Sequence, residues 1–181
     1  MLFFKIIIFV IVISFIINLP TVYKVVHEDV AIEYTPYKYG FFRELSEREM
    51  VCLADNIFFE SRNQSDLGKK AVAYVTLNRL SSSKFPDNLC NIVYAKKGKV
   101  CQFSWTCKNL AVRSIKNREM EMWQRSMSIA NQAVFSYNIS DDPTIGASHF
   151  HADYVKPFWS SFFHRTVTID NHLFYRPRYG T

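Results

Sequence analysis

The sequence contains few of the residues that break regular structure or keep a chain disordered. It has 5 glycines and 6 prolines among 181 residues, while hydrophobic residues make up 49% and aromatic residues 16%. This composition excludes a collagen-like, low-complexity or intrinsically disordered chain. The length fits one domain with an appendage and leaves little room for two full domains.

The sequence also lacks a run rich in lysine and arginine, although its formal net charge is +6. This charge favours an anionic surface or polymer as surroundings, but without a basic run we predict no nucleic-acid partner. None of the four cysteines forms a C-x-x-C pair, and their spacings do not suit zinc. We therefore expect no metal and no cofactor.

A long apolar run stands at the start of the sequence. Residues 2–19 read LFFKIIIFVIVISFIINL and are interrupted only by Lys5, Ser14 and Asn18. A helix of this length nearly crosses the hydrocarbon core of a bilayer. No small-residue cleavage site follows the run, which favours an uncleaved transmembrane anchor at residues 1–20 over a cleaved signal peptide. Residues 21–44, with one proline, a glycine and mixed charges, are expected to form a stalk before a body at residues 45–181.

The cysteines of the body are even in number. In an exported domain Cys52, Cys90, Cys101 and Cys107 allow two disulfides with three possible connectivities. Pairing Cys90 with Cys101 would close a short basic loop, so we favour that pair and leave Cys52 with Cys107. Four reduced cysteines, packed as small hydrophobic residues, are the alternative if the body stays in the cytosol.

The first part of the body has the periodicity of helices. Ser46 and Glu49 form a capping box, and the apolar stripe that follows predicts a helix to about Glu60. A second helix, capped by Ser65 or Asp66 and running to about Arg79, is apolar nearly all round and suits the centre of the core. We expect a short helix or turn at 88–94 and a third long helix at about 116–137.

The last part of the body is expected to be extended. Residues 147–154 alternate weakly, and residues 166–169 and 172–175 flank Asp170-Asn171 as in a β-hairpin. Helices followed by a small late sheet indicate an α+β fold that is mainly helical.

Glu60 is the sharpest candidate for chemistry. It follows Leu53 by seven residues and Ile57 by three, so it projects from the apolar stripe of its helix. Burial raises the pKa of a carboxyl group, and a carboxylic acid that stays protonated near neutral pH can protonate a leaving oxygen. Cleavage of a glycosidic bond uses such an acid. The alternative is a side chain that turns to solvent at a frayed helix end.

Several motifs follow one another along the body and resemble a known family. They are CLADNIFFESR at 52–62, GKKAVAYVTLNR at 68–79, FP at 85–86, CQFSWTC at 101–107, GASHFHA at 146–152 and NHLFY at 171–175. In this order they resemble the SleB/CwlJ family of cell-wall hydrolases, which includes spore cortex-lytic enzymes and phage relatives. The resemblance covers about residues 47–176.

The resemblance implies a lysozyme-like α+β catalytic domain that acts on peptidoglycan glycan strands. It implies that the catalytic acid is Glu60, at the end of the pattern N-I-[YF]-x-E-[AS]-R. Members are described as lytic transglycosylases or muramidase-like hydrolases. The family pattern continues Ala-Arg-Gly-Glu, whereas this chain has Ser61-Arg62-Asn63-Gln64, so Gln64 replaces the second acid.

The shortage of carboxylates bears on mechanism. Hydrolysis usually needs two, yet Asp55 points away from Glu60 on the helix and Asp66 is better explained as a helix cap. We therefore favour a lytic transglycosylase that cleaves between N-acetylmuramic acid and N-acetylglucosamine. In it Glu60 protonates the glycosidic oxygen and then accepts the proton of the sugar's own 6-hydroxyl. A muramidase-type hydrolase is the alternative.

Other residues are candidates for substrate binding. Trp105 offers an aromatic face for a sugar ring or is a core residue, and the histidine pair lines the groove or holds zinc. Asn171 contributes to binding or only makes the turn. The full set is Gln102, Ser104, Trp105, Thr106, His149, His151 and Asn171.

Two other functions stay open. A zinc amidase would use His149 and His151, and a wall-binding or lysis-regulating membrane protein would have no activity. For the favoured function we expect the protein to be located in the inner (cytoplasmic) membrane. If the chain is phage-encoded, this would be the membrane of the host. The catalytic domain would be exported to the periplasm or cell wall, with the membrane bound through residues 2–19.

Overall fold

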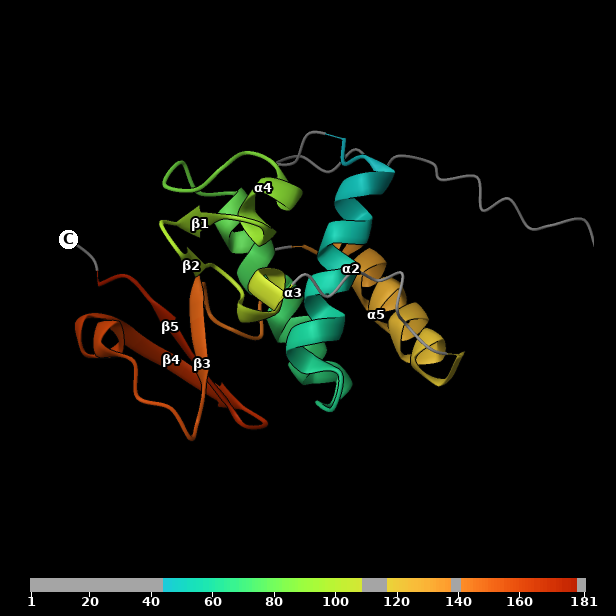
Figure 1. The fold of residues 1–181 in the computed structure, drawn as a ribbon. Helices are drawn as coiled ribbons and strands as arrows, with labels where there is room; N and C mark the ends of the chain where they lie inside the picture. The colour runs from blue at the N-terminus through green and yellow to red at the C-terminus, as the bar shows by residue number, and fades with distance from the viewer. Residues whose placement is uncertain (1–43, 109–116, 138–140, 179–181) are drawn as a thin grey trace, which may run out of the picture. The chain divides into compact units, whose positions relative to one another are not determined.

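The computed structural model describes residues 44–108, 117–137 and 141–178 (Figure 1). The predicted anchor at residues 1–20 and nearly all of the predicted stalk at 21–44 lie outside the described residues. Within these three described ranges, no helix is both long enough and apolar enough to cross a bilayer.

The first two helices begin with side-chain caps. Helix α2 spans Glu47–Ser61, and the Ser46 hydroxyl accepts a hydrogen bond from the Glu49 N–H while the Glu49 carboxylate accepts one from the Ser46 N–H. This confirms the predicted capping box. Helix α3 spans Asp66–Leu80 and is capped by Ser65, whose hydroxyl accepts a backbone hydrogen bond, so Asp66 is not the cap.

Helix α3 is the centre of the core, as its apolar sequence predicted. It packs against α2, α4 (Leu89–Val93) and α5 (Asn117–Phe135). The residues of its central turns, 71–77, are all buried. Full burial of a valine or leucine side chain contributes about 1.5–3 kcal/mol, so the large apolar residues of this cluster stabilise the fold. The fully buried residues of α2 and α3 in this cluster include Leu53, Ala54, Ile57, Val72, Ala73, Tyr74 and Leu77.

The three-stranded sheet follows the α-helices in the chain, which confirms the predicted α+β fold, while a short two-stranded hairpin precedes α5. β1 (Lys96–Lys97) and β2 (Val100–Cys101) form a short hairpin, followed by the 3-10 helix η1 (Ser104–Lys108). β3 (His149–Ala152), β4 (His164–Ile169) and β5 (His172–Arg176) form an antiparallel sheet in the order β3-β5-β4. The hairpin of β4 and β5 turns at Asp170-Asn171, as predicted.

The two faces of the three-stranded sheet have different neighbours. Phe150 and Phe174 form a buried cluster with Ala71 and Val75 of α3. Because side chains alternate along a strand, His149 and His151 lie on the opposite face. That face is covered by aromatic rings of the connection between β3 and β4.

The tip of the β4–β5 hairpin docks on the start of α3. Asp170 adopts a positive φ of 50°, and its carboxylate accepts hydrogen bonds from the Ser65 N–H at 2.9 Å and the Ser65 hydroxyl at 2.8 Å. A Cβ atom at Gly68 would overlap this carboxylate and lie 2.9 Å from the Cβ of Gln64. The close approach of hairpin and helix therefore requires glycine at residue 68.

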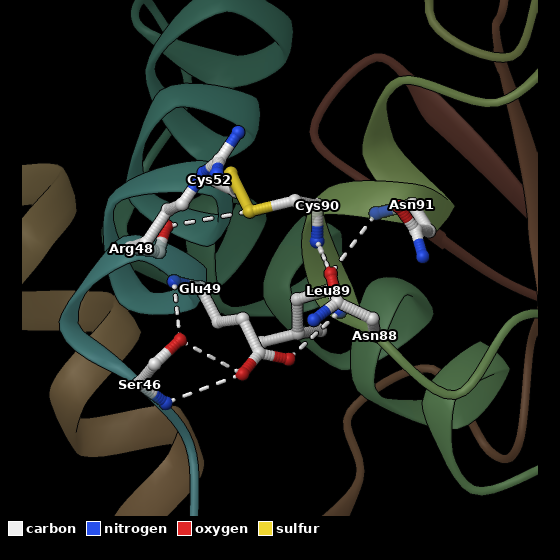
Figure 2. Close-up of a disulfide and its surroundings, with 8 residues drawn as sticks. All are labelled: Ser46, Arg48, Glu49, Cys52, Asn88, Leu89, Cys90 and Asn91. Atoms are coloured by element: carbon white, nitrogen blue, oxygen red, sulfur yellow. Dashed lines mark hydrogen bonds between the residues drawn. A yellow bond between two sulfur atoms is a disulfide. The ribbon is translucent and has the colours of Figure 1, made fainter.

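The disulfides are Cys52–Cys90, shown in Figure 2, and Cys101–Cys107, so the predicted pairing was wrong. The Glu49 carboxylate accepts a hydrogen bond from the Leu89 N–H, which docks the start of α4 on α2 and brings the Cα atoms of Cys52 and Cys90 to 5.2 Å. The β1–β2 turn and η1 fold the chain back locally, so Cys101 reaches Cys107 instead.

Candidate active site

Glu60 lies in the last turn of α2 and is only partly exposed. Burial raises the pKa of its carboxyl from 4.5 to about 7, and the nearby positive charge of Arg79 offsets part of this rise. Near neutral pH the protonated and ionised forms are therefore present in comparable amounts. This is the state that a group needs in order to give up a proton and take one back.

Arg79, in the last turn of α3, is a site residue to which the sequence analysis assigned no role. Its side chain is 2% exposed, and its Nε donates a hydrogen bond to the Ser148 carbonyl at 2.7 Å. Its guanidinium lies over the rings of Phe103 at 5.1 Å and Phe85 at 5.5 Å. A buried cation without a paired anion is costly, so its presence beside Glu60 points to an electrostatic role.

Gln102 completes the surroundings of Arg79. With its amide oriented so that the oxygen faces the guanidinium, Gln102 accepts hydrogen bonds from both terminal nitrogens of Arg79 at 3.2 Å. The Gln102 side chain is otherwise exposed, as is that of Ser104 at the start of η1. Both residues are therefore accessible to a ligand, as the sequence analysis required.

Trp105 and Thr106 are buried instead of lining an open surface. Trp105 is 5% exposed, stacks on Phe59 with ring centroids 4.5 Å apart and donates a hydrogen bond to the Asn56 side chain at 3.2 Å. The Thr106 hydroxyl donates to the Phe103 carbonyl. These contacts favour the alternative that Trp105 is a core residue. It holds Phe59, the residue before Glu60, in place.

The two candidate histidines of β3 are held by neighbouring groups. His149 Nδ1 lies 2.9 Å from the Ser148 hydroxyl, and burial together with the charge of Arg79 lowers the His149 pKa to about 4. His151 hydrogen-bonds the Ala152 carbonyl through Nδ1 and the Tyr175 hydroxyl through Nε2. Both ring nitrogens of His151 are therefore engaged, and His149 is neutral at neutral pH.

Asn171 lies at the hairpin tip and not in the loop around Gln102. Its side-chain oxygen accepts a hydrogen bond from Gln64, and its carbonyl accepts one from the Asp153 N–H at 2.8 Å. Gln64 stands where the family pattern has its second acid. At this position the amide ties the loop after α2 to the sheet.

The nearest carboxylates along the chain are both engaged elsewhere. Asp55 is buried and accepts a hydrogen bond from Trp123 Nε1 at 2.7 Å, and burial raises its pKa to about 6. Asp66 is exposed and forms an ion pair with Arg125 on α5. Neither therefore stands as an evident base or nucleophile for a sugar at Glu60.

The described residues also bear on metal binding and pockets. Among them, no group of three or more His, Cys, Asp or Glu side chains gathers to hold a metal ion. One pocket lies between α3 and α5 and contains none of the predicted site residues; its lining includes Asp66, Lys70, Arg125 and Gln132. The proposed site consequently depends on the geometry around Glu60 and Arg79.

Comparison with known proteins identifies the family. The family described as Cell Wall Hydrolase matches residues 63–175, more than half of the chain. The chain belongs to the cell wall hydrolase family. The predicted resemblance is thereby confirmed, and the chain is classed among enzymes of the bacterial wall. The matched segment starts three residues after Glu60, so the family match itself does not cover that residue.

One curated relative and two solved structures are similar to this chain. A curated spore cortex-lytic enzyme from Halalkalibacterium halodurans is 26% identical over 130 residues, which are 71% of this chain and 35% of the relative. The chain thus spans about a third of the relative's length. The catalytic domain of the Bacillus cereus SleB protein has a TM-score of 0.60 at 20% identity, covering 77% of this chain and 98% of that one. The catalytic domain of the germination-specific lytic transglycosylase SleB from Bacillus anthracis has a TM-score of 0.59 at 20% identity, with 77% and 100% covered. These structures share the fold.

Proposed function

We propose that this chain cleaves peptidoglycan glycan strands as a lytic transglycosylase, with Glu60 as the acid and then the base. The observation that carries the proposal is the carboxyl of Glu60 in the last turn of α2, whose pKa burial raises to about 7. The family membership supports the wall as substrate, and the lytic transglycosylase activity named for the Bacillus anthracis SleB domain supports the reaction type.

The reaction needs two proton transfers, one from Glu60 and one back to it. The protonated Glu60 donates to the oxygen that joins C1 of N-acetylmuramic acid to C4 of N-acetylglucosamine, and the C1–O bond breaks. The N-acetylglucosamine side leaves with a free 4-hydroxyl. The 6-hydroxyl oxygen of the muramic acid then bonds to C1, and its proton returns to the Glu60 carboxylate. The product ends in a 1,6-anhydro ring, and no water is consumed.

Arg79 is proposed to act as a positioning residue for this proton transfer. After donation Glu60 carries a negative charge in a partly buried position, and the nearby guanidinium stabilises that charge. The hydrogen bonds of Arg79 to Ser148 and Gln102 fix the guanidinium between the sheet and the β2–η1 segment. In this way Arg79 adjusts the proton affinity of Glu60 without having to contact the sugar.

Substrate contacts are proposed for the accessible residues of the predicted set. The exposed side chains of Gln102 and Ser104 can hydrogen-bond sugar hydroxyl or N-acetyl groups, while His149 and His151 brace the sheet beside them. The buried side chains of Trp105 and Thr106 pack beneath the surface and support the segment that carries Gln102 and Ser104. A hydrolase remains the second outcome, because water in place of the 6-hydroxyl would give a reducing end with the same acid.

The test is the chemistry of the products. Purified sacculi are digested with the full chain, and the released fragments are identified by mass spectrometry. We expect 1,6-anhydromuramic acid ends. Reducing ends would assign a hydrolase, and free stem peptides without glycan cleavage would contradict both assignments and favour an amidase.

Matched variants connect this activity to Glu60. We expect Glu60→Gln to release no glycan fragments, because the amide has no proton to give at this step, whereas Asp55→Asn should retain most of the activity. An active Glu60→Gln enzyme that is inhibited by a chelator would instead support the zinc amidase. Binding of strands without release by the wild type would support a non-enzymatic protein.

We also propose that the body is exported and tethered to the inner membrane by residues 2–19. The two disulfides support an oxidising compartment, because such bonds are rare in the cytosol. Thiol titration of the denatured protein, taken from cells under acid quench, should find no free thiol before reduction. Four free thiols would place the body in the cytosol.

A further inference from the structure

The connection between β3 and β4 presents aromatic side chains to solvent. We call residues 154–163 the aromatic loop; it includes the 3-10 helix η4 (Phe158–Phe162) and follows β3 in Figure 1. Tyr154 is 82% exposed, Phe158 83% and Phe162 58%. The rings of Phe158 and Phe162 contact each other with centroids 5.0 Å apart. An exposed apolar cluster of this kind is typical of an interaction surface.

The inner side of the aromatic loop fixes it to the sheet. Trp159 packs against His149 with centroids 5.4 Å apart and against Tyr175 at 5.5 Å, and Phe163 packs against His149 at 4.5 Å. These contacts lie on the sheet face opposite the one that packs on α3. The exposed rings are therefore held outward by a packed base, on the far side of the sheet from α3.

The charges around the aromatic loop are positive. From Tyr154 to Ile169 the sequence contains no aspartate or glutamate, although Asp153 directly precedes this stretch and Asp170 directly follows it. Lys156 and Arg165 are exposed within it. A third cation is added by Arg178, which donates a hydrogen bond to the Ser161 carbonyl at 3.2 Å. The surface thus combines protruding apolar rings with a basic border.

We propose that the aromatic loop docks on the surface of an anionic phospholipid bilayer. Phe158 and Phe162 enter the boundary between headgroups and acyl chains, and Lys156, Arg165 and Arg178 face the headgroup phosphates. The basic border complements the phosphates of anionic headgroups, which favours a lipid surface as the occupant. The docking is independent of the chemistry at Glu60 and adds a second membrane contact to the proposed N-terminal tether.

The test measures amide hydrogen exchange in the aromatic loop of the full chain. Exchange is compared without vesicles, with vesicles of phosphatidylcholine, and with vesicles of phosphatidylcholine and phosphatidylglycerol. A local readout is needed because residues 2–19 can hold the chain on a vesicle whether or not the loop docks. Variants are Phe158→Ser/Phe162→Ser and, as a matched control, Leu67→Ser/Val100→Ser, which removes two exposed apolar residues elsewhere.

We expect anionic vesicles to slow exchange at residues 154–163 about tenfold, an effect of the size that burial of part of two phenylalanine rings produces. The effect should persist in the Leu67→Ser/Val100→Ser control, disappear in Phe158→Ser/Phe162→Ser, and weaken at high salt. The proposal is overturned if anionic vesicles leave exchange in the loop unchanged. It is equally overturned if purified sacculi protect the loop and vesicles do not, or if protection follows self-association without lipid.

Discussion

Replacement of Glu60 by glutamine should stabilise the fold at alkaline pH while it abolishes activity. Burial raises the carboxyl pKa from 4.5 to about 7, so the unfolded chain ionises this group at a lower pH than the folded one. Below pH 4.5 both states keep the proton and the shift has no consequence. Between pH 4.5 and about 7 the unfolded chain loses this proton while the folded chain keeps it, so stability falls over this range. Above pH 7 both states are ionised, and the folded state bears the full cost of a buried carboxylate.

The magnitude follows from the shift. A pKa difference of this size corresponds to about 3 kcal/mol, and partial exposure of the side chain reduces it to about 2 kcal/mol. A neutral glutamine avoids this cost. Glu60→Gln should therefore unfold at a higher urea concentration than the wild type at pH 8, with little difference at pH 4.

The assay is urea unfolding of the two full-length proteins at both pH values, with the disulfides intact. Glu121→Gln on α5, at an exposed glutamate, is the matched control and should change stability by less than about 0.5 kcal/mol at either pH. Equal stability of Glu60→Gln and the wild type at pH 8, or the same gain at pH 4, would refute the argument that burial keeps this carboxyl neutral.

Three further predictions concern Arg79, Gly68 and the disulfides. Arg79→Met should raise the Glu60 pKa, because a positive charge is lost, and should move the alkaline limit of the pH–activity profile upward. Arg79→Lys should keep this limit closer to that of the wild type. An unchanged limit in Arg79→Met would show that the charges of Arg79 and Glu60 do not interact. Gly68→Ala should lower the free energy of unfolding, measured in urea, by about 1–3 kcal/mol, because the added Cβ overlaps the Asp170 carboxylate. The loss should be smaller in an Asp170→Ala background. Equal losses in both backgrounds would exclude the overlap. A disulfide stabilises the fold by restricting the unfolded chain, and more so when it closes a longer loop. Replacing Cys52 and Cys90 by serine, with a sequence separation of 38, should therefore lower the free energy of unfolding by about 4 kcal/mol, against about 2 kcal/mol for Cys101 and Cys107 with a separation of 6. The reverse order would contradict this argument.

The helices, the late hairpin and Glu60 could be predicted because their signals are local. The capping box at Ser46 and the apolar stripe fix where α2 begins and which face is buried, and Glu60 follows from its spacing on that stripe. The role of Arg79 could not be predicted in this way. Its partner Ser148 is 69 residues away, and an arginine at the end of an apolar helix resembles an ordinary solvated terminus.

The cysteine pairing and the position of Trp105 failed for a related reason. Loop length alone favoured Cys90–Cys101, whereas the pairing is decided by how α4 docks on α2 through the Glu49 carboxylate. Trp105 suits a sugar or a core equally well in sequence, and only its contacts with Phe59 and Asn56 distinguish the two. Tertiary contacts of this kind leave no periodic signal.

The most direct test of the account is a carbon-13 NMR titration of the glutamate carboxyl groups in the folded protein. We predict one resonance that titrates near pH 7, is absent in Glu60→Gln and moves to a higher midpoint in Arg79→Met. Titration of every glutamate near its ordinary value of 4.5 would contradict the claim that Glu60 is held neutral for proton donation.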